Sequence, residues 1–158
     1  MSAFLSLLKN SIEYGSIVNA LKCGRVPMGV IGLTPVHKAH YISSVCEELG
    51  RMSLIVCPDE ATASKMCDDL NTFSSGAEVY PARDYNFRVS DTQSREFEQR
   101  RIGVLSKMLT GECRYVLCSV KAAMQLTLPA EELKKRTLRL VSGEDVPQSK
   151  IIRTLLSA

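Results

Sequence analysis

The chain has 158 residues, of which 45% are hydrophobic and 23% are charged, and its formal net charge is +3. These values are ordinary for one soluble globular domain with its own core, and the mild charge permits a nucleic-acid partner without arguing for one. No apolar run approaches the roughly 20 residues of a membrane-spanning helix, which argues against a helical membrane protein.

Apolar periodicity and breaks at Gly or Pro divide the chain into alternating helices and strands. The predicted helices cover residues 4–12, 16–21, 35–49, 61–73, 95–109, 120–126, 129–135 and 148–156. The predicted strands cover residues 28–31, 52–57, 77–80, 114–120 and 137–141. This alternation predicts an α/β fold with a parallel sheet and right-handed crossovers. No stop residue follows Leu156, so we expect the chain to end within an element.

Six cysteines are spread along the chain without the C-x-x-C spacing of a zinc site or a redox pair. Unpatterned cysteines in an α/β chain predict reduced thiols and a cytoplasmic protein, and the apolar start of the chain lacks the basic flank of a signal peptide. Because six is an even number, a disulfide framework is the alternative. The cysteines are Cys23, Cys46, Cys57, Cys67, Cys113 and Cys118.

The segment from Gly32 to Ala39 occupies the place of a phosphate-binding loop, between an apolar run and a helix. Against the pattern G-x-x-x-x-G-K-[ST], Gly32 and Lys38 match, whereas His37 replaces the second glycine and Ala39 replaces the hydroxyl residue. Pro35 also removes one backbone donor. We therefore predict a vestigial loop that binds no nucleotide.

Two alternatives concern the same segment. A variant nucleotide site would use Gly32, Thr34 and Lys38, and Mg²⁺-dependent ATP binding would reveal it. His37 and His40 lie three residues apart on the predicted helix and could share a metal ion. Two ligands without a nearby Cys or carboxylate are weak support for that, so we predict no metal site.

Two basic runs are candidate nucleic-acid contacts. The first lies on the helix over residues 95–109 and the second follows residue 133. Glutamates interleave with both, so a solvated charged face is the simpler interpretation. Within the long irregular loop over residues 81–94, the stretch from Pro81 to Phe87 is a further candidate, either as the remnant of a DNA-facing edge or as a loop whose Tyr85 and Phe87 pack back onto the core. The basic residues are Arg95, Arg100, Arg101 and Lys107 in the first run, and Lys134, Lys135, Arg136 and Arg139 in the second.

Five motifs in this order resemble the N-terminal UvrB-like module of the bacterial transcription-repair coupling factor, over most of the chain from about Gly29. They are Gly32-Leu-Thr-Pro-Val-His-Lys-Ala-His, Leu54-Ile-Val-Cys-Pro-Asp-Glu, Tyr80-Pro-Ala-Arg-Asp-Tyr, Gln99-Arg-Arg-Ile-Gly-Val-Leu and Val116-Leu-Cys-Ser-Val-Lys-Ala-Ala-Met-Gln-Leu-Thr-Leu-Pro. UvrB itself would carry an intact G-K-T and a long aromatic-rich hairpin where this chain has only residues 81–94. This difference favours the coupling factor over UvrB.

The resemblance implies a three-layer sandwich of the P-loop NTPase kind, corresponding to a degenerate helicase domain 1a over residues 1–136. A second small domain would begin at Thr137, and most of it, with the UvrA contact, would lie beyond Ala158. The resemblance further implies a non-catalytic module of a translocase that displaces stalled RNA polymerase from double-stranded DNA and recruits UvrA. ATP and magnesium would act in separate motor domains. The alternative is the nucleotide-binding or DNA-binding domain of an active UvrB-like helicase.

Overall fold

The computed structural model describes residues 7–83, 96–138, 140–143 and 145–157 of the chain. It divides into two compact units, Met1–Gln125 and Leu126–Ala158. The first unit holds η1 (Leu8–Asn10), α2 (Ile12–Lys22), α3 (Pro35–Leu49), β1 (Ser53–Cys57), α4 (Glu60–Phe73), β2 (Ala77–Tyr80), α5 (Glu96–Thr110), β3 (Tyr115–Ser119) and α6 (Val120–Ala123). The second holds α7 (Ala130–Arg136) and α8 (Gln148–Ser157). No helix in the described ranges is long and apolar enough to cross a membrane.

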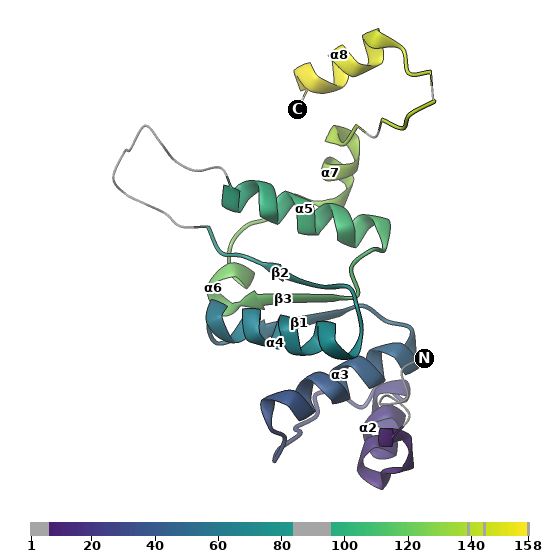
Figure 1. Ribbon diagram of the computed structural model, residues 1–158, viewed down its shortest axis with the longest axis vertical. Coiled ribbons are helices and arrows are strands. Elements are labelled where there is room, and N and C mark those ends of the chain that lie inside the picture. The colour runs from purple at the N-terminus through teal and green to yellow at the C-terminus, as the bar shows by residue number, and fades with distance from the viewer. Residues whose placement is uncertain (1–6, 84–95, 139, 144, 158) are drawn as a thin grey trace, which may run out of the picture. The chain divides into compact units, whose positions relative to one another are not determined.

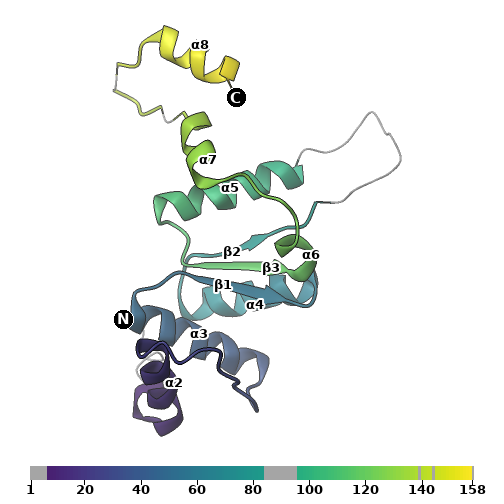
Figure 2. The same cartoon turned by 180° about the vertical axis from the view of Figure 1, so that it is seen from behind.

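A three-stranded parallel sheet forms the centre of the first unit, with the strand order β1-β3-β2 (Figure 1). The central strand β3 is buried along its whole length, because helices cover both of its faces. Figure 2 shows the same sheet from behind, with α4 on its far side. The predicted α/β class with a parallel sheet is therefore confirmed.

Alternating side chains of β3 divide the core between the two faces of the sheet. Tyr115 and Leu117 join the cluster beneath α3 and α4, whereas Val116 and Cys118 join the cluster beneath α5. This alternation follows from the two-residue period of a strand, which sends successive side chains to opposite faces. The two helical layers and the sheet between them make the expected sandwich.

Two predicted strands are wrong. Met28–Ile31 precedes α3 without forming a strand, and Val30 and Ile31 are exposed. The apolar run is only four residues long, includes Gly29, and has no neighbouring strand in the described structure, so strand propensity alone does not order it. In the second unit, the described part of residues 137–141 is not a strand either. Four of its residues are described, and none pairs with another strand.

Helix α2 packs on α3 through Tyr14, which is buried and makes an edge-to-face contact with Tyr41 at 5.9 Å between ring centroids. The Tyr14 hydroxyl donates a 3.0 Å hydrogen bond to Glu48, and Lys22 forms a 3.2 Å ion pair with the same carboxylate. Bonds from Lys22 and then Tyr14 hold the pKa of Glu48 below its usual value. One carboxylate thus joins the two helices.

This carboxylate should make the helix pair sensitive to acid. Because the pKa of Glu48 is lower in the folded chain, its contribution is present above the unfolded value of 4.5 and is lost as pH falls through the folded value. We expect the melting temperature of the wild type to exceed that of Glu48→Gln at pH 7. The difference should be only about 2–4 °C, because the ion pair is partly exposed to water. The difference should shrink as pH falls through the lowered pKa of Glu48 in the folded chain. Glu47→Gln is the matched control, and a constant difference at all pH values would contradict the assignment.

Candidate functional site

The start of α3 uses up the backbone donors that a phosphate would need. Pro35 has no N–H, the N–H of His37 donates to the Thr34 hydroxyl at 3.4 Å, and the N–H of Lys38 donates to the Thr34 carbonyl at 2.9 Å. Over residues 35–38 only the Val36 N–H is left without a partner in the described structure. A phosphate-binding loop needs several consecutive N–H groups directed at one anion. This helix start therefore offers a capped N-terminus in place of an anion nest.

The position of the missing metal-binding hydroxyl points into the core. Ala39 has no exposed surface and belongs to the cluster beneath α3 and α4. A hydroxyl there would meet apolar neighbours instead of a solvated Mg²⁺, and it would lose its hydrogen bonds to water. Lys38 is exposed beside it and belongs to no ion pair in the described part of the chain. Gly32 keeps the turn, with φ at +81°.

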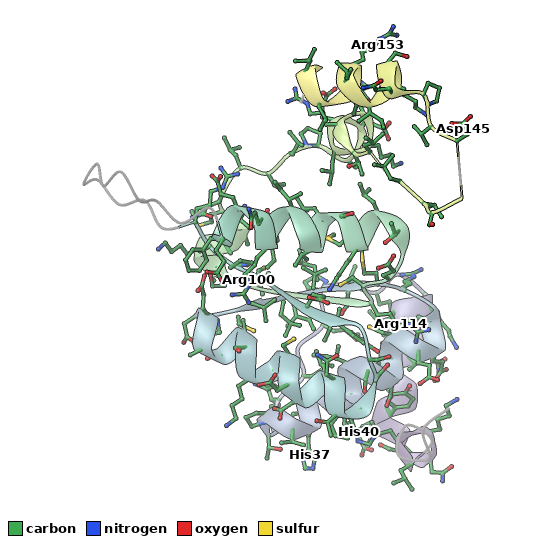
Figure 3. The ribbon with its side chains drawn as sticks, turned by 45° about the horizontal axis from the view of Figure 1, so that its top comes forward. His37, His40, Arg100, Arg114, Asp145 and Arg153 are labelled. Atoms are coloured by element: carbon green, nitrogen blue, oxygen red, sulfur yellow. The ribbon has the colours of Figure 1, made fainter. Side chains whose placement is uncertain are left out.

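The two histidines on α3 do not point to a shared metal site (Figure 3). The His40 ring stacks on Phe73 with 4.9 Å between ring centroids and 12° between planes. His37 is exposed at the first turn. Within the described ranges, no group of three or more His, Cys, Asp and Glu side chains could hold a metal ion. The stacking of His40 gives that side chain a packing role between α3 and α4.

At the carboxyl end of the sheet, side chains hold the backbone that leaves β2. Glu60 accepts a 2.7 Å bond from the Ala82 N–H. Gln125 accepts 2.7 Å from the Arg83 N–H and donates 3.0 Å to the Arg83 carbonyl, so its carboxamide pairs with that residue as a neighbouring strand would. Neither role is predictable from the local sequence pattern. Their partners lie 22 and 42 residues away in the chain, where local periodicity carries no signal.

Arg101 completes this arrangement from inside the fold. Its guanidinium lies 4.1 Å from the centroid of the Tyr80 ring and donates to the Pro81 carbonyl at 2.7 Å and to Gln125 at 3.0 Å. Only 2% of the residue is exposed. The structure thus directs the charge of Arg101, a predicted nucleic-acid contact, into the protein. Glu60, Arg101 and Gln125 together hold the backbone that follows β2, and we call these three residues the clamp.

The other predicted nucleic-acid residues fall in four places. Lys107 on α5 forms an ion pair with Glu78 on β2. Arg100 is exposed on α5 and lies between α5 and α4 (Figure 3). Arg95 and Arg139 lie outside the described residues, as does most of the loop over residues 81–94. On α7 the basic residues are ion-paired within the helix. The pairs are Lys134 with Glu131 at 3.6 Å, Lys135 with Glu132 at 2.9 Å and Arg136 with Glu132 at 3.8 Å.

The thiols have packing roles. All six cysteines are unpaired, and burial raises the pKa of each of the five that lie within α3, the strands, α4 and the turn before β3. For Cys67 the pKa rises to about 11. Because the thiolate is the reactive form, these groups are poor nucleophiles at neutral pH. A thiol-based catalytic site is therefore not supported in this part of the chain.

Two kinds of known protein are similar to this chain over most of its length. The transcription-repair-coupling factor of Bacillus subtilis is 22% identical over 158 residues, which cover 99% of the chain. UvrABC system protein B of Microcystis aeruginosa is 23% identical over 143 residues, covering 81% of the chain, and that of a Nostoc species is 25% identical over 156 residues, covering 89%. The chain is a homologue of both kinds. No family model matches it.

The relationship confirms the resemblance seen in the ordered motifs and places this UvrB-like chain among homologues of DNA-repair proteins. The chain spans only 13% of the length of the coupling factor and 21% to 23% of the UvrB proteins. It thus corresponds to a small part of each relative. The features that differ from a working phosphate loop, His37, Ala39 and Pro35, lie within the aligned part of the coupling factor, since almost the whole chain is matched.

Proposed function

We infer that this chain is a non-catalytic scaffold and interaction module of a transcription-coupled DNA-repair translocase. One observation supports this inference: over residues 35–38 of the described structure only the Val36 N–H is left without a partner, whereas a phosphate-binding loop directs several consecutive N–H groups at one anion. The buried Ala39 removes the magnesium ligand from the same turn. The helix start serves to order the sandwich, because Thr34 caps α3 and Ala39 anchors it to the core.

The wider role is also part of the proposal, and the homology to a transcription-repair-coupling factor supports it. In the parent protein, ATP and magnesium would act in separate motor domains that move along double-stranded DNA and displace RNA polymerase. UvrA would be recruited through a second small domain that begins at Thr137, and the other domains of the same protein would contact this module. We propose a cytoplasmic protein, in keeping with four buried thiols and one half-buried thiol whose pKa values burial raises.

Calorimetric titration of the chain with ATP and Mg²⁺ tests the non-catalytic assignment. We expect no saturable heat up to millimolar ATP, and Lys38→Ala should give the same baseline. Saturable, Mg²⁺-dependent binding in the micromolar range that Lys38→Ala abolishes would overturn the proposal. That result would support the alternative, an active UvrB-like nucleotide-binding domain.

A further inference from the structure

A groove of about 390 Å³ lies between α4 and α5, along the outer edge of β2. Ser64 and Asp68 line its α4 wall, Arg100 and Lys107 line its α5 wall, and β2 forms its floor. Gly103 faces the groove in the middle of α5, and a Cβ placed there would meet no atom within 4 Å. A glycine inside a helix costs about 1 kcal/mol relative to alanine, so this open position comes at the expense of helix stability.

On the outer edge of β2, side chains already bond to the backbone on both sides of Val79. The Gly76 carbonyl accepts bonds from the start of β3. Because the backbone groups of successive residues in a parallel ladder point to opposite sides, the backbone groups of Ala77, Val79 and Pro81 point away from β3. The Asn71 carboxamide bonds to both the N–H and the carbonyl of Ala77, at 3.0 and 3.1 Å. Arg101 bonds to the Pro81 carbonyl. Between them, the backbone of Val79 has no side-chain partner in the described structure.

The walls of the groove carry opposite charges. On the α5 wall Arg100 makes no ion pair in the described structure, and Lys107 is bonded to Glu78. On the α4 wall Asp68 is likewise without an ion-pair partner there. An extended peptide beside β2 would send alternate side chains to these two walls. Its residue opposite Val79 would face α4, because the Val79 side chain packs in the cluster beneath that helix.

We propose that this groove binds an extended segment of a partner polypeptide with the charge order acidic–basic–acidic. The central residue exchanges two backbone hydrogen bonds with Val79 and directs its basic side chain toward Asp68. The flanking residues face α5, where an acidic side chain pairs with Arg100 and Gly103 leaves room for it. Asn71 and Arg101 limit the contact to this short stretch. The mode is strand addition to a sheet edge, with specificity from the alternating side chains.

Fluorescence anisotropy on the full 158-residue chain tests the proposal with two labelled peptides. One carries the core Val-Glu-Lys-Glu-Val and the other the inverse core Val-Lys-Glu-Lys-Val, both with blocked ends. We expect saturable binding of the first and at least tenfold weaker binding of the second. The double variant Arg100→Glu with Asp68→Lys should reverse this preference. Equal binding of both peptides, or a preference unchanged in the double variant, would overturn the proposal.

The backbone contact has its own test. Val79→Pro removes an N–H that points away from β3, where proline is tolerated on an edge strand. The substitution should weaken the binding of the first peptide at least tenfold, while the circular dichroism spectrum of the chain stays unchanged. Should that variant unfold, methylation of the amide nitrogen of the central peptide lysine gives the same test on the wild-type protein. Undiminished binding of the methylated peptide would rule out strand addition.

Discussion

Arg101→Ala should lower the free energy of unfolding by about 2–4 kcal/mol, a large share of the stability of a small domain. The substitution removes the contact with the Tyr80 ring, leaves the Pro81 carbonyl without its side-chain donor, and takes one of two donors from the Gln125 side-chain oxygen, which keeps the Arg83 N–H. Buried acceptors that lose a partner keep the cost of their desolvation. Urea unfolding followed by far-ultraviolet circular dichroism measures the change.

Arg100→Ala is the matched control, because it removes the same side chain from the adjacent, exposed position of α5. We expect it to change the free energy of unfolding by less than about 0.5 kcal/mol. Arg101→Lys should lie between the two variants, since a lysine keeps the charge but not the planar fork. If the two alanine variants lose equal stability, Arg101 does not hold the clamp together.

Leu117→Ala should destabilise the chain by about 2–5 kcal/mol, the range for a fully buried leucine whose site cannot collapse. Leu117 lies on the central strand and has no exposed surface. The cavity left by the lost methyl groups would be enclosed by α4 and the neighbouring strands, because Leu117 sits in that cluster. Urea unfolding again provides the measurement.

Leu54→Ala is the comparison on the edge strand β1, where 65% of the leucine is exposed. The Leu54 side chain lies on a part of the sheet that no helix covers. The substitution should therefore lower the free energy of unfolding by less than about 1 kcal/mol. A loss as large as that of Leu117→Ala would mean that this face is covered in solution. Sedimentation of the wild type would then show whether a second copy provides the cover.

Much of the fold could be predicted because the signals for its helices are local. Pro35 sits in the first turn of α3 and Gly50 ends it in the left-handed conformation, as the sequence indicated. Asp59 caps α4, and its side chain accepts the Thr62 N–H at 2.7 Å. Strand β3 was found from its continuous apolar run. Each of these features depends on residues within one turn of the position it determines.

The errors concern features that depend on distant partners. The run before α3 has strand composition, but a strand also needs a neighbour, and no local pattern supplies one. The sequence pattern groups Arg101 with Arg100 on one charged face, although Arg101 is buried and Arg100 is exposed. Arg101 faces inward, where its guanidinium donates to Gln125, a residue 24 positions further along the chain. In the segment from Gly32 to Ala39, the departures from the phosphate-loop pattern can be read from the sequence, but the bonds of the His37 and Lys38 N–H groups to Thr34 appear only in the structure.

Deamidation of Asn71 would change the hydrogen bonds at the outer edge of β2. Asparagine is among the thermolabile side chains, and its hydrolysis gives aspartate. An aspartate at this position could still accept the Ala77 N–H, but it would set a carboxylate oxygen against the Ala77 carbonyl, where the amide now donates at 3.1 Å. The two acceptors would repel, and the Ala77 carbonyl would lose its side-chain donor while the Ala77 N–H stays bonded. A sample in which Asn71 has become aspartate would therefore present one more unbonded carbonyl on the outer edge of β2.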